Sequence, residues 1–213
     1  CVKANWTDSY TQECNTFLQT FPEEINELLD NEHHLHEIIE DNPLFNYRAL
    51  LYDLSGSPKT ILYECDNHGE IFIDLLFIET LLKQNHRIIL CARQNPILND
   101  VTYTDLLTLL KAHELSDLTP CIKSKQLSLI THGSSDVIVR RTQMNNPYID
   151  AYTKSDLLIL KGQGNFESYP KHQNHRYLKP HYHLFGIKSS FTLRSAQKAY
   201  NKVSLNMPVL LEI

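Results

Sequence analysis

The sequence predicts an α/β protein, a Rossmann-like three-layer α/β/α sandwich with a mostly parallel sheet and a helical segment ahead of it. From about Thr60 onward, short β-branched runs alternate with amphipathic stretches, and each run is apolar throughout rather than at every second position. Continuous apolar strands are typical of parallel sheets that are buried on both faces, and alternation with helices supplies the crossover connections that such sheets require.

The first part of the chain, residues 7–53, has apolar residues at helical spacing, which predicts two or three helices. The segment Ser55-Gly-Ser-Pro58 then breaks the pattern. We therefore expect a helical N-terminal segment at residues 1–58 and an α/β/α domain at residues 59–213. Because residue 1 is Cys rather than Met, we expect the helical segment to be incomplete at its start.

Five apolar runs are expected to form the strands of the sheet. They are residues 60–65, 87–92, 127–131, 156–160 and 183–187. An amphipathic stretch at residues 70–84 separates the first two runs, and another at residues 103–113 follows the second. Both stretches are expected to be helices.

The composition is that of an ordinary globular protein, with 42% hydrophobic and 21% charged residues. Lys and Arg number 20 and Asp and Glu 25, so we expect no broad basic surface for a nucleic acid. No apolar run approaches the roughly 20 residues that span a bilayer, so we expect no membrane partner. The five cysteines are odd in number and lack metal-ligand spacing, which favours reduced thiols and a cytoplasmic location. The oligomeric state stays open.

Polar residues follow the expected strands at the edge where open parallel sheets bind ligands. Asp66 and Asn67 follow the first strand, and Asp100 lies after the second. Two carboxylates and an amide oxygen are hard ligands that suit Mg²⁺ or Mn²⁺. Because each Asp closely precedes a helix, helix N-capping is the competing interpretation.

The segment Lys161-Gly-Gln-Gly-Asn165 follows the fourth strand. Its small residues let backbone N–H groups approach an anion and its lysine adds a charge, which is typical of a phosphate site. The third Gly of a dinucleotide fingerprint and the Gly-Lys-Ser/Thr ending of a P-loop are missing, so a plain turn is the competing interpretation.

Three segments together resemble motifs of the damage-control phosphatase family, a metal-dependent group, in its short form. They are Asp66-Asn-His-Gly-Glu-Ile-Phe-Ile-Asp74, Arg93 through Pro96-Ile-Leu-Asn-Asp100, and Asp156-Leu-Leu-Ile-Leu-Lys-Gly-Gln-Gly-Asn-Phe-Glu167. The similarity runs from about Thr60 to Lys188, and Lys188 itself is similar to a lysine of the family.

The resemblance implies a metal-dependent phosphatase of small phosphorylated metabolites: sugar phosphates, nucleotides or damaged cofactor phosphates. It implies a divalent metal, Mn²⁺, Mg²⁺, Co²⁺ or Ni²⁺, held by Asp66, Asn67 and Asp100. Asp66 or Asp100 would orient the attacking water or supply an aspartyl nucleophile, and Lys161 would neutralise charge on the phosphoryl group. The other residues expected to bind substrate or phosphate are Glu70, Arg93, Asn165, Glu167 and Lys188.

Two other functions stay open. One is a binding module that keeps an inactive metal and phosphate pocket. The other is an S-adenosylmethionine-dependent methyltransferase, which is less favoured because no Gly-x-Gly follows the first strand.

Several residues near these motifs have simpler interpretations. Asp74, one helical turn after Glu70, is expected to be structural. His132 follows the third strand and is either an acid–base group or a hydrogen-bonded loop residue. The histidines at 172, 175, 181 and 183 lack a ligand partner at a known spacing and are expected on the surface.

Overall fold

The structure is a computed structural model that describes residue 42 and residues 44–111, 118–136, 139, 143–169, 179–198, 203–205 and 207–212. Contacts divide the chain into two compact units, Cys1–Pro43 and Leu44–Ile213. Every helix and strand described belongs to the second unit. The helices predicted before residue 44 and the histidines at 172 and 175 lie outside the described residues.

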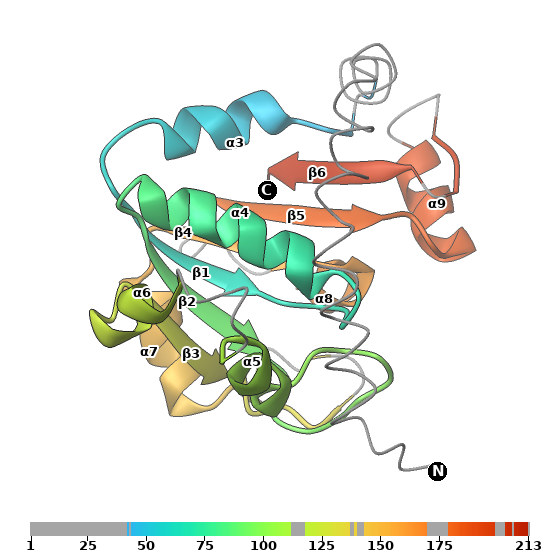
Figure 1. Cartoon of the computed structure of the whole chain (residues 1–213). Helices are drawn as coiled ribbons and strands as arrows, with labels where there is room; N and C mark the ends of the chain where they lie inside the picture. Colours follow the sequence, from blue (N-terminus) through green and yellow to red (C-terminus); the bar gives the residue numbers. More distant parts are fainter. Residues whose placement is uncertain are drawn as a thin grey trace, which may run out of the picture. The chain divides into compact units, whose positions relative to one another are not determined.

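The strands of the described residues form one six-stranded sheet in the order β3-β2-β1-β4-β5-β6 (Figure 1). Strands β1 to β5 are parallel, and β6 runs antiparallel to β5 at the edge. The bounds are Thr60–Glu64 (β1), Arg87–Ala92 (β2), Leu127–Thr131 (β3), Leu157–Lys161 (β4), His181–Gly186 (β5) and Pro208–Glu212 (β6). The predicted mostly parallel sheet is confirmed, with β6 as a strand that the sequence did not predict.

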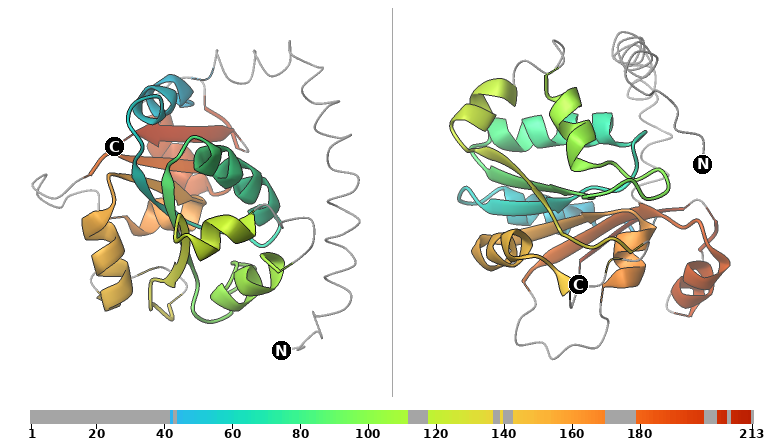
Figure 2. Two further views of the ribbon diagram at one scale, coloured as in Figure 1. Left: turned by 60° about the vertical axis from the view of Figure 1, so that its left-hand side comes forward. Right: turned by 90° about the horizontal axis from the view of Figure 1, so that it is seen from below.

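Helices cover both faces of the sheet. Their bounds are Tyr47–Leu54 (α3), Ile71–Lys83 (α4), Tyr103–Leu109 (α5), Thr119–Lys123 (α6), Asn146–Lys154 (α7), Gln163–Ser168 (α8) and Ser190–Gln197 (α9). Helices α4, α5 and α6 lie on one face, and α7 and α8 lie on the other (Figure 2). This arrangement confirms the predicted three-layer sandwich.

The centre of the sheet is buried on both faces, as the continuous apolar runs predict. In β1, Ile61, Leu62 and Tyr63 are fully buried, and so are the apolar residues of β4 beside them. A strand buried in this way has no solvent-facing side. The two strands therefore form a rigid base from which the following loops emerge.

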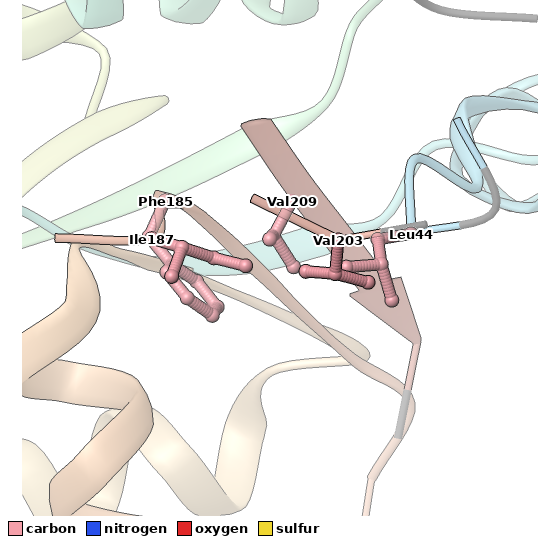
Figure 3. Packing of buried hydrophobic residues seen from close by; sticks show 5 residues of the cluster. All are labelled: Leu44, Phe185, Ile187, Val203 and Val209. Atoms are coloured by element: carbon pink, nitrogen blue, oxygen red, sulfur yellow. The ribbon is translucent and has the colours of Figure 1, made fainter. Parts of the chain in front are cut away.

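The second compact unit starts at Leu44, ahead of the predicted domain start at residue 59. Leu44 packs in a cluster of buried residues around β5 and β6, shown in Figure 3. The N–H of Leu210 donates to the Leu44 carbonyl at 2.7 Å, and the N–H of Asn46 donates back to the Leu210 carbonyl at 2.9 Å. These contacts join the α3 segment to the sheet.

His181 and His183 are buried in β5, so the expected surface position is wrong for both. Aromatic rings from α8 and the residue after it cover them: the Phe166 ring lies 5.2 Å from that of His183, and the Tyr169 ring 4.6 Å from that of His181. Tertiary packing, which local spacing does not encode, places these imidazoles in the interior.

Within the described residues, no helix is long and apolar enough to cross a membrane. Three of the five cysteines fall in this part of the chain. Cys65, Cys91 and Cys121 are free thiols, as expected from the odd count and the spacing.

Candidate active site

The predicted site residues lie at the point where the order of the sheet reverses. Strands β1 and β4 are neighbours, while β2 and β3 continue to one side and β5 to the other. In open α/β sheets, ligands bind at this switch point, outside the carboxyl ends of the strands. Asp66 follows β1, Asp100 follows β2 and Lys161 ends β4, so the three motifs meet at this edge.

Backbone hydrogen bonds join the loops after β1 and β2. The N–H of Val101 donates to the Asp66 carbonyl at 2.8 Å, and the N–H of His68 donates to the Asn99 carbonyl at 2.9 Å. Between them, Asn67 and Asp100 pair as an isolated antiparallel bridge. The backbone thus brings the three predicted metal ligands to one place, although Asp100 lies more than 30 positions after Asp66 and Asn67 in the sequence.

The competing N-cap interpretation is wrong for both aspartates. The N-cap of α4 is Glu70, and the N-cap of α5 is Thr102, whose side chain accepts from the N–H of Asp105 in a complete capping box. Asp66 and Asp100 therefore have no helix to cap. Their carboxylates lie at the sheet edge without the capping role that would explain them.

Two other carboxylates lie close to Asp66 and repel its negative charge. Burial raises the pKa of its carboxyl group, and the nearby Asp100 and Glu70 carboxylates raise it further, to about 7. The Asn67 amide donates to Asp66 Oδ2 and to Glu70 Oε1, both at 3.1 Å. Since both contacts use the amide nitrogen, Oδ1 is the atom with which Asn67 would bind a cation.

These donors fit a hard divalent cation. Among the described residues, no three His, Cys, Asp or Glu side chains are grouped as a metal site, so the third ligand here would be the amide oxygen of Asn67. Carboxylate and amide oxygens suit Mg²⁺ or Mn²⁺, which leave further positions to water and phosphate. A cation would also relieve the repulsion that raises the pKa of Asp66.

Arg93 forms an ion pair with Asp100. Its Nε donates to Asp100 Oδ2 at 2.7 Å, and its Nη1 donates to the Asp136 carbonyl at 3.1 Å. Both side chains of this ion pair are nearly buried. The structure thus places the guanidinium where it orients a predicted metal ligand; contact with phosphate stays a prediction.

Lys161 and Lys188 lie on the other side of the site, around Glu70. Lys161 Nζ is 3.2 Å from Glu70 Oε2, and Lys188 Nζ is 3.5 Å from Glu70 Oε1. Although burial raises the pKa of Glu70, Lys161, the Asn67 amide and Lys188 together bring it below its ordinary value. Glu70 is therefore an anion held by two lysines and an amide.

Asn165 and Glu167 hold the loops of the site together. The Asn165 amide donates to the carbonyls of Lys161 at 2.7 Å and Cys65 at 3.2 Å, which ties α8 to the ends of β4 and β1. Glu167 Oε1 accepts from the Thr192 hydroxyl at 2.7 Å, which joins α8 to α9. Their predicted contact with substrate stays a prediction.

Gln163 is a site residue that sequence reasoning missed. Its amide oxygen accepts from the backbone N–H of Lys188 at 2.7 Å, and its amide nitrogen donates to Glu167 at 2.7 Å. It thereby fixes the start of the Lys188 loop. The signal was its place between the two glycines of the motif after β4.

His132 is a hydrogen-bonded loop residue, one of the two interpretations that the sequence allowed. Its Nδ1 accepts from the backbone N–H of Ser134 at 3.0 Å, and its side chain is buried. The Ser134 hydroxyl in turn accepts from the N–H of Asp136 at 3.3 Å. This loop carries the carbonyl that Arg93 binds.

The fold and the site define the class: a doubly wound α/β protein with an acidic and lysine-containing site at its switch point. Residues 14–203 match the sequence model of the damage-control phosphatase ARMT1-like domain. The chain therefore belongs to this family.

Relatives from archaea are similar over most of the chain. An uncharacterised protein of Methanocaldococcus jannaschii is 30% identical over 160 residues, which cover 72% of this chain and 48% of the relative. The damage-control phosphatase PH1575 of Pyrococcus horikoshii is 29% identical over 140 residues, which cover 65% of this chain and 45% of the relative. The chain spans about half the length of these relatives.

The fold is also that of a solved structure. The crystal structure of PH1575, described as a DUF89 family protein, superposes with a TM-score of 0.58 at 25% sequence identity. The similarity covers 77% of this chain and 50% of the solved one.

Gly162 should be irreplaceable next to Asp66. Its φ of 83° and ψ of 153° lie in a region that is essentially restricted to glycine, and an added Cβ would lie 2.0 Å from the Asp66 carboxyl carbon. We expect Gly162→Ala to lower the free energy of unfolding by about 2 kcal/mol or more, measured by urea denaturation. Gly164→Ala is the matched control, because a Cβ there meets nothing within 4 Å and should change stability by less than about 1 kcal/mol. Equal effects of the two changes would contradict the close contact.

Asp66 should make the metal-free protein less stable as the pH rises. Because the folded pKa of about 7 lies above the ordinary value of 3.8, the folded state binds more protons between these pH values, and stability falls as the pH increases through them. Asp66→Asn should therefore be more stable than the wild type at pH 8, by about 1 to 3 kcal/mol after solvent screening. Near pH 4 the difference should disappear. Urea unfolding of both proteins across this range, with EDTA present, measures it, and parallel pH profiles would refute the raised pKa of Asp66.

Proposed function

We propose that this chain is a metal-dependent phosphatase that hydrolyses small phosphorylated metabolites. The observation that carries the proposal is the convergence of Asp66, Asn67 and Asp100 at the switch point, with neither aspartate used as a helix cap. The family, and the printed names of relatives as damage-control phosphatases, support the same activity. The free thiols support a reducing compartment, which we propose to be the cytoplasm.

Asp66, Asn67 and Asp100 would hold the divalent ion, which is Mg²⁺, Mn²⁺, Co²⁺ or Ni²⁺ in this proposal. Such an ion supplies a fixed positive charge that polarises a phosphoryl oxygen. Arg93 keeps Asp100 in place by its charge-assisted hydrogen bond of 2.7 Å. The guanidinium would thus orient a ligand of the metal, and its predicted contact with the phosphate remains part of the proposal.

Lys161 and Lys188 would bind the phosphate of the substrate. They lie within 3.5 Å of the same Glu70 carboxylate, so the space between them already suits an anion. Lys161 would neutralise the charge that grows on the phosphoryl oxygens as the ester bond breaks. The preferred substrates are accordingly phosphate monoesters, whose dianionic group matches two ammonium groups.

Phosphatase activity that depends on added metal tests the proposal. After exhaustive treatment with EDTA, the full chain should hydrolyse none of a panel of sugar phosphates, nucleotides and p-nitrophenyl phosphate, and Mg²⁺, Mn²⁺, Co²⁺ or Ni²⁺ should restore hydrolysis of at least one. Full activity after chelation would exclude a role of the metal. Binding of metal and phosphate without turnover would indicate an inactive binding module instead.

A variant shows whether any hydrolysis arises at this site. Lys161→Met should lower kcat roughly 100-fold, about the loss of one preorganised electrostatic contact. Lys83→Met is the matched control: this lysine is exposed at the end of α4 and pairs with Glu79, so kcat should not change. Equal kcat values for wild type and Lys161→Met would remove Lys161 from the site.

A further inference from the structure

Lys161 belongs to a buried row of three polar side chains. The row consists of Tyr63 from β1, Asp74 from α4 and Lys161 from the end of β4, and all three residues are buried. The Tyr63 hydroxyl donates to Asp74 Oδ1 at 2.7 Å, and Lys161 Nζ lies 3.2 Å from the same oxygen. One carboxylate oxygen therefore binds both neighbours.

Stability alone does not explain this row. Taking an ammonium and a carboxylate out of water is costly, and apolar residues of similar volume often replace a buried ion pair without loss of stability. In addition, one polar atom of this row lacks a hydrogen bond to the described residues. Asp74 Oδ2 is buried and has no hydrogen-bond partner in the described part of the chain. Such a cost points to a role in function.

The two carboxylates that flank Lys161 differ in exposure. Glu70 and Asp74 are separated by one turn of helix and each places an oxygen 3.2 Å from Lys161 Nζ. The Glu70 side chain is 36% exposed and is shared with Lys188 and Asn67, whereas that of Asp74 is 4% exposed. A phosphate that arrives from solvent would take the place of Glu70 and would leave Asp74 in contact with the lysine.

We propose that Asp74 and Tyr63 are positioning residues, which hold the Lys161 ammonium in one place at the end of β4 while its exposed partner changes from Glu70 to the substrate phosphate. This inference rests on the proposed function. Asp74 acts through its charge and its contact with Lys161, and Tyr63 acts by fixing the direction of the Asp74 carboxylate.

The charges around Lys161 agree with this role. Burial lowers the pKa of Lys161, but Asp74 and, next, Glu70 raise it more, so that the pKa lies above its ordinary value. In the described part of the chain, Cys65 and Asp66 at the end of β1 also interact electrostatically with Lys161. The lysine thus stays an ammonium. Because Asp74 is more deeply buried than Glu70, water screens its attraction to the ammonium less.

The protonation of Lys161 tests the role of Asp74 directly. The full chain is labelled with ¹³C-lysine, and the NMR signal of the Lys161 side chain is identified as the one that is missing in Lys161→Met. This signal is then followed as the pH rises. Asp74→Asn should lower the titration midpoint of Lys161 by about one pH unit or more, and Glu70→Gln should lower it less and leave it above the ordinary range. The proposal would be overturned if Glu70→Gln lowered the titration midpoint of Lys161 as much as Asp74→Asn does. It would also be overturned if the midpoint in Glu70→Gln fell below the ordinary range of a lysine. The Glu70→Gln result decides by itself if Asp74→Asn does not fold.

A hydroxyl deletion tests Tyr63. With a phosphate ester that the wild type hydrolyses, Tyr63→Phe should lower kcat about 3- to 10-fold with little change in KM, the loss of one hydrogen bond that positions a charged group. Tyr182→Phe is the matched control: Tyr182 is also fully buried, and its hydroxyl donates to Asp53 of α3 at 2.9 Å, so its kcat should not change. Equal kcat values for the two variants would overturn the role of Tyr63. A wild type that hydrolyses no ester would contradict the proposed function alone, since the NMR experiment needs no turnover.

Discussion

The repulsion among three carboxylates at the carboxyl end of β1 is the constraint on which the rest of the site depends. Burial, together with the nearby Asp100 and Glu70 carboxylates, raises the pKa of Asp66 to about 7. Arg93 compensates Asp100, and Lys161 helps to compensate Glu70. Asp66 is left as the least compensated carboxylate. A divalent cation at this place would remove the repulsion, which is why the arrangement is easier to understand as a metal site than as a device for stability.

The backbone holds these charges together against their repulsion. Asn67 and Asp100 are paired by the bridge between two loops, and Gly162, one strand away, leaves room for the Asp66 carboxylate. Both features arise from the neighbouring positions of β1, β2 and β4 in the sheet. The chemistry of the site is therefore a consequence of strand order as much as of the residues themselves. Residues 66 and 162 meet only because the sheet reverses its order between β1 and β4.

Much of the fold was predictable because parallel strands buried on both faces leave continuous apolar runs, and polar residues that follow such runs mark the ligand-binding edge. Two short elements were not predicted: α6 has only five residues, and the apolar run of β6 has only three, Val209-Leu-Leu211. The sequence could not decide whether Asp100 caps a helix, because Thr102 competes for that role two residues later. Nor could it reveal that Arg93 binds Asp100, or that the core-like Tyr63 and the helical Asp74 support Lys161, since those contacts join separate elements.

Metal affinity of the ligand variants tests the account most directly. Mn²⁺ is titrated by calorimetry into the EDTA-treated full chain and into Asp66→Asn, Asp100→Asn and the control Asp156→Asn, whose carboxylate accepts from the Thr60 N–H at the opposite end of β1. The account predicts one Mn²⁺ site in the wild type and in the control, and binding weaker by roughly 100-fold or more in the two ligand variants. Folded Asp66→Asn and Asp100→Asn proteins that both bind Mn²⁺ as tightly as the wild type would contradict it.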